Sequence, residues 1–181
     1  MKTRIAMLIL FLVLAASGAG LLAEDVKALG TIFAVSKDAK ARLKAGQTVA
    51  IFLTGNDTLF TRIVEDAVDI TLVNAGFDVV NREKLEKTVG EQVDKKRKDK
   101  AEGVAINALE VGKAVNAAFI VTGTVIVESD EQKSLVLKMG SFQLVDVPGE
   151  RTLIHVLFEP EKGRSLSETA RGFVEIVKQS M

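Results

Sequence analysis

The stretch that most constrains the fold runs from 108 to 127, where a helical pattern gives way to a long apolar run. Apolar residues recur at helical spacing up to Val115, and Asn116 tolerates the left-handed conformation in which many helices end. From Ala117 onward the run is rich in β-branched residues, which is typical of a strand buried on both faces. Gly123 interrupts this run, and a glycine inside a strand usually marks a bulge or a close approach of another backbone. We therefore expect a central strand here, covered on two sides.

Strand-like and helix-like segments alternate on both sides of this stretch. The predicted strands are 48–53, 77–80, 117–127, 135–147 and 152–158, and the predicted helices are 59–74, a segment after Asn81, 108–115 and a segment starting near Ser167. Because strands and helices alternate up to residue 127, the first three strands should be parallel neighbours joined by right-handed crossovers. The sequence therefore predicts a single α/β domain at 47–181. It should contain a mixed sheet of about five strands, two or three helices on one face and a C-terminal helix.

The helix predicted at 59–74 follows a polar loop that ends in a helix cap near Asp57. Apolar residues recur along it widely enough to predict a broad buried face. That face is expected to contain Leu59, Phe60, Ile63, Val64, Ala67, Ile70 and Leu72.

Three segments are less regular. Residues 31–35 are compatible with a short strand or with the start of a helix, and Ser36 is a candidate cap for a short helix in the peripheral segment 24–46. The alternation in 135–147 changes phase at Gly140 and Ser141, where we expect a β-bulge. The run from 91 to 103 is almost entirely charged, so it is either an exposed extension of the preceding helix or a mobile loop.

The first 23 residues have the pattern of a secretory signal peptide. Lys2 and Arg4 precede an apolar run at 5–16, and small residues follow, so cleavage is expected after Ala19 or Ala23. The alternative is an uncleaved membrane anchor, which the glycines in this segment disfavour. Ala19 stands where a lipobox would carry its cysteine. We therefore expect a periplasmic protein that has no transmembrane segment after cleavage and is not a Cys-anchored lipoprotein.

Composition excludes several function classes. The chain has 181 residues, a formal net charge of zero, one histidine and no Cys, Trp or Tyr. Disulfides and thiolate chemistry are thus excluded. The chain has no excess of basic residues, which general nucleic-acid binding would require. His155 has no second histidine or spaced carboxylates to form a metal site with it, and no Gly-x-Ser-x-Gly motif accompanies it. Gly112-Lys113 is not a P-loop, and Gly112 is better explained by helix–sheet packing. We expect no enzymatic activity and no cofactor.

Three segments, in the right order, resemble one known family. They are GFDVVNREKLEKTVGEQ at 76–92, VGKAVNAAFIVTGTV at 111–125 and FQLVDVPGERTL at 142–153. Together they resemble the CsgG/TolB-amino-terminal-like superfamily of bacterial envelope proteins, over roughly residues 48–158. The resemblance implies a TolB-amino-terminal-like, anticodon-binding-like fold and a non-enzymatic assembly or interaction module of the envelope. The alternative that it implies is a subunit of a curli-type outer-membrane secretion channel.

The residues selected as candidate contacts for a partner are all charged. Arg82 and Glu91 match an arginine and a glutamate of the family pattern. Because a cation at a helix start opposes the helix dipole, Arg82 should have a carboxylate or carbonyl partner elsewhere. The densest charged run adds Lys95, Lys96, Arg97 and Lys98. A solvated helix end or loop is the preferred explanation of this run, and a docking patch for an acidic partner or an anionic surface is the alternative. The expected partners are envelope proteins of unknown identity, with a homo-oligomer possible.

Overall fold

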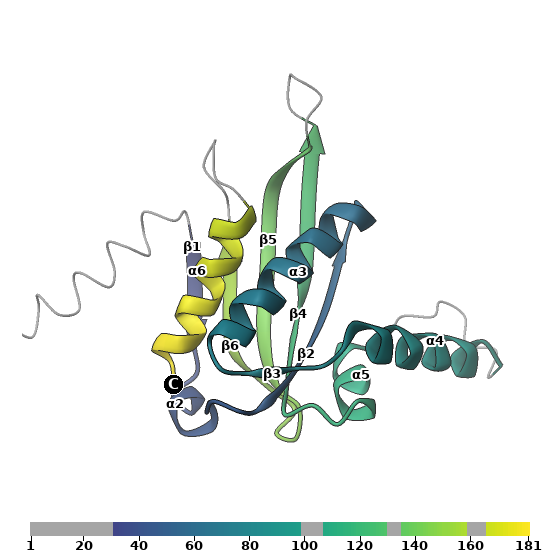
Figure 1. Cartoon of the computed structure of the whole chain (residues 1–181), viewed down its shortest axis with the longest axis horizontal. Helices are drawn as coiled ribbons and strands as arrows, with labels where there is room; N and C mark the ends of the chain where they lie inside the picture. Colours follow the sequence, from purple (N-terminus) through teal and green to yellow (C-terminus); the bar gives the residue numbers. More distant parts are fainter. Residues whose placement is uncertain (1–30, 99–106, 130–134, 159–165) are drawn as a thin grey trace, which may run out of the picture.

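The computed structural model describes residues 31–98, 107–129, 135–158 and 166–181, which build one mixed sheet with helices packed on it (Figure 1). The six strands lie in the order β1-β6-β5-β4-β2-β3. They are β1 (Thr31–Val35), β2 (Thr48–Gly55), β3 (Asp78–Val79), β4 (Phe119–Ser129), β5 (Leu135–Asp146) and β6 (Arg151–Phe158). The helices are α2 (Ala39–Arg42), α3 (Thr58–Asn74), α4 (Arg82–Lys98), α5 (Ala108–Ala114) and α6 (Leu166–Gln179).

The sheet has a parallel half and an antiparallel half. β2 runs parallel to both β3 and β4, as the alternation of strands and helices predicted. β4, β5, β6 and β1 are antiparallel to their neighbours. The sixth strand is β1, the segment whose conformation the sequence left open, and it forms an edge beside β6. β3 is shorter than predicted, and this shortness exposes part of the edge of β2.

Helices cover both faces of the sheet, whereas the sequence predicted one main helical face. Successive residues of β4 point to opposite sides, so Val121 joins a core with α3 and α6 while Ile120 joins a core with α4 and α5. In Figure 1, α3 and α6 lie across the front of the sheet, and α4 and α5 lie at its lower end. The continuous apolar run of β4 is explained by this double burial.

The turn and close approach predicted around the central strand are confirmed. Asn116 has a φ of 58°, and the amide of Ala117 donates to the carbonyl of Gly112, so α5 ends where expected. An ideal Cβ at Gly123 would lie 1.8 Å from the carbonyl oxygen of Ser141, so two backbones meet at this point. Gly112 packs against Ile120, as a helix–sheet contact requires.

The bulge predicted at Gly140 and Ser141 is wrong. Both residues pair in continuous register with β4 and β6, and the register shifts instead lie at Ile126/Val127 and at Leu144/Val145. Gly140 has a different reason to be a glycine: an ideal Cβ there would lie 2.9 Å from the ring of Phe142. The glycine therefore makes room for a buried ring rather than for an extra residue.

The apolar face predicted for α3 is only half right. Phe60, Val64 and Leu72 are buried against the sheet and α6, together with Val68. Leu59, Ile63 and Ile70 are exposed. At 100° per residue these exposed side chains lie on the opposite side of the helix from the buried ones. Because α3 crosses the sheet as an outer layer, one of its sides has nothing to pack on.

The less regular segments are now placed. α2 begins at Ala39 with Asp38, rather than Ser36, at its N-cap position. Asp57 caps α3 by accepting a hydrogen bond from the amide of Phe60. α4 continues to Lys98, so the charged run up to that residue extends the helix, and 99–103 lie outside the described residues. Residues 1–30, and with them the predicted signal peptide, also lie outside.

Candidate functional site

A groove lies beside the part of β2 that extends past its neighbouring strand β3. β3 pairs only with Thr48 and Val49, and within the described part of the chain no strand pairs with this edge of β2 beyond them. Because α3 follows β2 and α4 follows β3, the two helices flank the open edge. The groove has a volume of about 370 Å³. It is lined by Ile51, Phe52, Leu53, Arg62, Glu65, Asp69, Val79, Val80, Arg82, Leu85, Glu86, Val89 and Gly90.

Arg82 is the predicted contact residue that the groove contains. It begins α4, and its Nη2 lies 2.6 Å from Asp66 Oδ1 and 3.6 Å from Glu65 Oε2 on α3. The sequence predicted a carboxylate or carbonyl partner for this arginine, and α3 supplies two carboxylates. A second ion pair joins Arg62 Nη2 to Glu86 Oε1 at 3.3 Å. The two pairs connect the first half of α3 to the start of α4 across the groove.

Glu65 links this charged rim to the strand edge. Its Oε1 accepts a hydrogen bond of 3.0 Å from the backbone amide of Leu53, in the place where a neighbouring strand would offer a carbonyl. Burial raises the pKa of Glu65, although the Leu53 hydrogen bond and Arg82 oppose the shift. Burial and the nearby charge of Asp66 also raise the pKa of Asp69. The groove thus contains two carboxyl groups whose burial is only partly offset by hydrogen bonds and nearby positive charge.

Sequence reasoning missed Glu65 and Asp69. Both stand four residues apart on α3 and therefore share one side of the helix. Acidic residues at that spacing inside an otherwise apolar helix were the available signal. The signal did not indicate a groove, because the open edge beside them depends on how far β3 pairs with β2.

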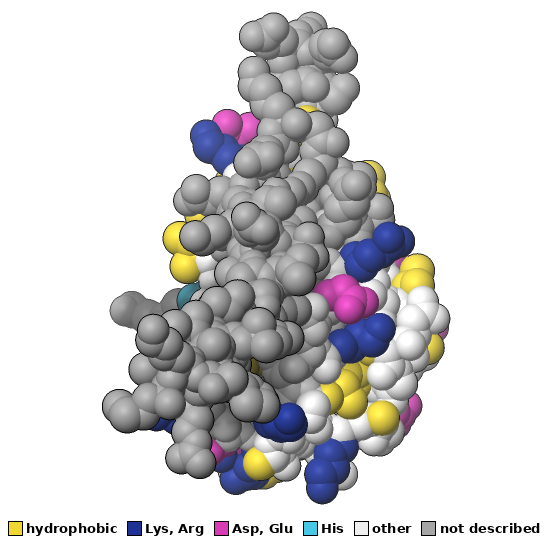
Figure 2. All heavy atoms as spheres, turned by 90° about the vertical axis from the view of Figure 1, so that its left-hand side faces the viewer, with side chains coloured by type: hydrophobic (Ala, Val, Ile, Leu, Met, Phe, Trp, Pro, Cys, Tyr) yellow, Lys and Arg dark blue, Asp and Glu magenta, His cyan; other side chains and the backbone are white. Residues whose placement is uncertain are grey.

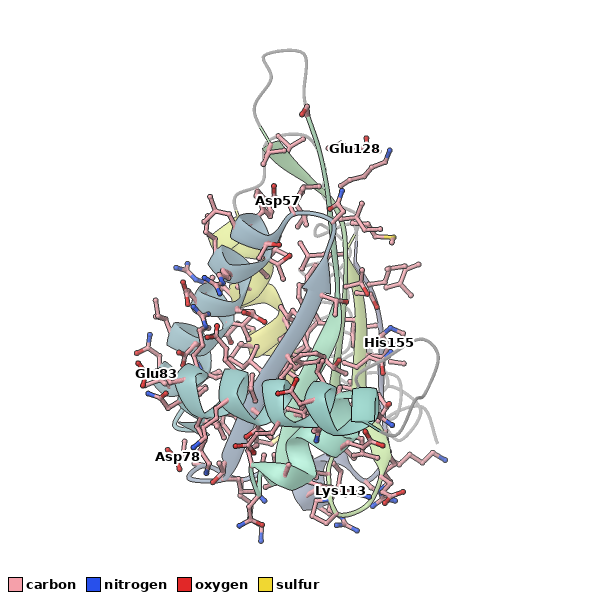
Figure 3. All side chains as sticks on the ribbon, turned by 90° about the vertical axis from the view of Figure 1, so that its right-hand side faces the viewer. Asp57, Asp78, Glu83, Lys113, Glu128 and His155 are labelled. Atoms are coloured by element: carbon pink, nitrogen blue, oxygen red, sulfur yellow. The ribbon has the colours of Figure 1, made fainter. Side chains whose placement is uncertain are left out.

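The other predicted contact residues lie elsewhere. Glu91 is exposed and follows Arg82 by nine residues, which places it on the opposite side of α4. Lys95, Lys96, Arg97 and Lys98 form the last turn of α4, about 20 Å along the helix from Arg82. In Figure 3 the start of α4, marked by Glu83, is the part next to α3. The structure therefore does not bring the six predicted contact residues into one site.

A second charged cluster has a structural role. Asp146 is 3% exposed, and its Oδ2 lies 3.2 Å from Arg42 and 3.7 Å from Arg151. Arg151 in turn contacts Asp38 at 2.6 Å. Since these residues belong to α2 and to the turn between β5 and β6, the cluster ties the edge of the sheet to its hairpin. A buried carboxylate between two arginines explains Asp146 without a ligand.

The groups available for bond-making chemistry are sparse in the described residues. His155 Nε2 lies 3.1 Å from Ser141 Oγ, but within the described chain no carboxylate contacts the imidazole. His155 is exposed on the sheet, on the other side of Figure 3 from Glu83. No group of three or more His, Cys, Asp or Glu residues in the described ranges could hold a metal ion. None of the helices described is long and apolar enough to cross a membrane.

Charge is scattered on the side of the molecule that carries β1 and α6. Figure 2 shows Lys and Arg side chains there interspersed with acidic and apolar ones on the described surface. A mixed surface of this kind does not create the broad single-sign field that steers a charged polymer.

Comparison with known proteins identifies the fold. No family model matches the sequence, and no curated protein matches it. A dodecamer of a PelC variant from Paraburkholderia phytofirmans is similar, with a TM-score of 0.50, 14% identity, and coverage of 83% of this chain and 98% of that chain.

Two further structures are more distant. The LpoB C-terminal domain from Salmonella enterica has a TM-score of 0.44 and 14% identity, covering 66% of this chain and 86% of that one. TolB from Acinetobacter baumannii has a TM-score of 0.45 and 14% identity, covering 84% of this chain and 31% of that one. These neighbours are envelope-associated proteins. At 14% identity the likeness to the PelC variant extends to the fold alone, and the CsgG-like part of the resemblance stays a prediction.

Proposed function

We propose that this protein is an exported, non-enzymatic interaction module of the bacterial cell envelope, and that it binds a protein partner in the groove between α3 and α4. The observation that carries the proposal is the open edge of β2, with apolar residues as the floor of the groove and ion pairs as its rim. The signal-peptide pattern at 1–23 supports export to the periplasm. The fold shared with envelope-associated proteins supports the same setting.

The groove suits an extended peptide segment of the partner. Exposed strand edges bind peptides by adding a strand, and pockets for alternate side chains supply specificity. Here the half-buried Phe52, Val79 and Val80 offer apolar contacts, and burial raises the pKa of the carboxyl groups of Glu65 and Asp69. The fitting segment therefore carries apolar side chains with a lysine or arginine among them.

The proposal extends to the far part of α4. Glu91 and the run Lys95–Lys98 would supply further polar contacts, because they continue α4 away from the sheet. Neutralising the four basic residues together should weaken partner binding without changing the fold, since they follow the part of α4 that contacts the core. Unchanged binding in this variant would restrict the interface to the groove.

Site-specific photo-crosslinking tests the groove itself. A photoreactive residue at Glu86, on the rim, should give a defined adduct in cells, and the same residue at Glu128 should not. Glu128 is an equally exposed glutamate near the far end of β4 (Figure 3). Arg82→Glu should reduce the adduct, whereas the matched charge reversal Lys87→Glu, on the exposed side of α4, should leave it. Equal adducts from both positions, or none, would contradict a groove-bound partner.

A further inference from the structure

The outer side of α3 carries a stripe of large apolar side chains that the fold does not use. Leu59 is 70% exposed, Ile63 46%, Ile70 64% and Val73 54%. Together with Asp66, which completes the series, these residues follow steps of four, three, four and three. This is the spacing of the contact positions of a coiled coil. We call the five residues the α3 stripe.

Nothing described in the structure covers the stripe. α3 packs on the sheet through the side that carries Phe60, Val64 and Val68, and the stripe lies on the opposite side. Figure 1 shows α3 as the front layer, with no described element in front of it. Large apolar side chains that gather exposed on one side of a helix often mark a contact with another molecule.

We propose that two copies of this chain associate through their α3 stripes in an antiparallel, two-fold symmetric helix pair. The stripe can meet itself in an antiparallel pair centred near Asp66, because Leu59 and Val73 each lie seven residues from Asp66, and Ile63 and Ile70 lie three and four residues from it. In the antiparallel pair Leu59 meets Val73 of the second copy, and Ile63 meets Ile70. This inference goes beyond the envelope-module proposal, and it shares Arg62 and Asp69 with the lining of the groove.

The charges beside the stripe select the antiparallel direction. Arg62 and Asp69 each precede an isoleucine of the stripe and so flank the contact on the same side. In an antiparallel pair such flanking positions face each other, so Arg62 of one copy meets Asp69 of the other, twice by symmetry. In a parallel pair the same two residues would face Ala67 and Asn74, which carry no charge. Burial and the charge of Asp66 raise the pKa of Asp69. The guanidinium group of Arg62 from the second copy would therefore stabilise the charged form of Asp69.

The acidic residue at the centre does not oppose this pairing. Two copies of Asp66 meet at the two-fold axis, but each is already 2.6 Å from its own Arg82. The axis therefore carries two carboxylates and two guanidinium groups, and no charge is left without an opposite neighbour. An anionic membrane surface is a poorer occupant of the stripe, because Glu65, Asp66 and Asp69 along α3 would repel it.

The first test is the oligomeric state of the purified protein. Sedimentation velocity over a range of concentrations should show a reversible dimer. Ile70→Lys should raise the dimer dissociation constant at least tenfold while the circular dichroism spectrum stays unchanged, because Ile70 is exposed in the monomer. Leu135→Lys is the matched control, since Leu135 is a similarly exposed leucine on β5. A monomer at all concentrations, or a dimer that Ile70→Lys does not weaken, would overturn the proposal.

The second test distinguishes the antiparallel pair from non-specific hydrophobic association. Arg62→Asp and Asp69→Arg should each weaken the dimer, because each places like charges opposite one another. The double variant Arg62→Asp/Asp69→Arg should restore association, since the pairs are then reversed but still complementary. Failure of the double variant to recover, or binding of the monomer to anionic vesicles that Ile70→Lys abolishes, would refute the antiparallel pair.

The third test uses the absence of cysteine from the chain, which makes every introduced disulfide assignable. Asp66→Cys lies on the axis and should form a disulfide with itself on mild oxidation. Leu59→Cys should not, because its two copies are about 20 Å apart along the antiparallel helices. A mixture of Leu59→Cys and Val73→Cys chains should cross-link to each other. Self-cross-linking of Leu59→Cys would indicate a parallel pair and contradict the inference.

Discussion

Replacing Gly123 by alanine should be among the most damaging single-methyl additions in this protein. Gly123 lies in β4, which has strands on both sides and helical layers on both faces. An ideal Cβ there would be 1.8 Å from the carbonyl oxygen of Ser141 and 3.0 Å from Cα of Phe142. The obstacle is backbone rather than the tip of a side chain, so rotation about a side-chain bond cannot relieve it.

The expected loss of stability follows from this geometry. β4 and β5 must separate by more than about 1 Å locally to restore a normal contact, which weakens about two ladder hydrogen bonds worth about 1 kcal/mol each. Overpacking of a close-packed interior adds about 1–3 kcal/mol. The sum is a loss of about 3–5 kcal/mol in the free energy of unfolding, which is a large share of a total of about 5–15 kcal/mol. The melting temperature should fall by about 6–20 °C for a domain of this size.

Urea unfolding monitored by circular dichroism measures this loss, and Gly90→Ala is the matched control. Gly90 lies inside α4, and an added Cβ there would meet nothing within 4 Å. Alanine is the better helix former, so this variant should be stabilised by about 0.5–1 kcal/mol. If Gly123→Ala stays within about 1 kcal/mol of the parent with an unchanged slope, the close approach of β4 and β5 is not as described.

Three further results are expected. Asp57→Ala should lower the free energy of unfolding by about 1 kcal/mol, because the carboxylate accepts the Phe60 amide at 2.7 Å, and Asp57→Asn should retain most of it; equal urea midpoints for the two variants would contradict the cap. Glu65 has a raised pKa in the folded state, so its contribution to stability is greatest below its ordinary pKa and is lost as the pH rises through the folded value. Glu65→Gln should therefore flatten the pH dependence of stability above the ordinary pKa of a glutamate, and an unaltered profile would exclude Glu65 as its source. Intact-mass measurement of the protein from the periplasmic fraction should show a chain that begins at Gly20 or Glu24. Recovery of the full-length protein in the inner membrane would contradict the export proposal.

Local chemistry was enough to predict most of the elements. The β-branched run of β4, the cap at Asp57 and the left-handed Asn116 each depend on residues within a few positions of one another. The same holds for the predicted C-terminal helix: the helical spacing of Ala170 and Phe173 puts them on one side of it, and both are buried in the structure. Such features are decided by backbone preferences and by periodicity, which the amino-acid sequence states directly.

Features that involve two distant segments were predicted poorly. The bulge expected at Gly140 was wrong. The glycine makes room for the ring of Phe142, and the register of the strand continues through it. The groove could not be foreseen from α3 and α4 alone. It exists because β3 pairs with only two residues of β2, and pairing length is a property of two strands together.

The chain by itself determined the order of the strands and helices after β1, the parallel start of the sheet and the need of Arg82 for a carboxylate or carbonyl partner. Only the tertiary structure decided which side of each helix is buried. α3 shows the reason: its apolar residues surround most of the helix, and periodicity cannot tell which of them will face the sheet. Burial depends on the position of a helix in the layers, and an outer helix leaves one side to solvent. Leu59 and Ile70 read as core in the sequence and lie on the surface in the structure, because the core was already filled from the other side of α3.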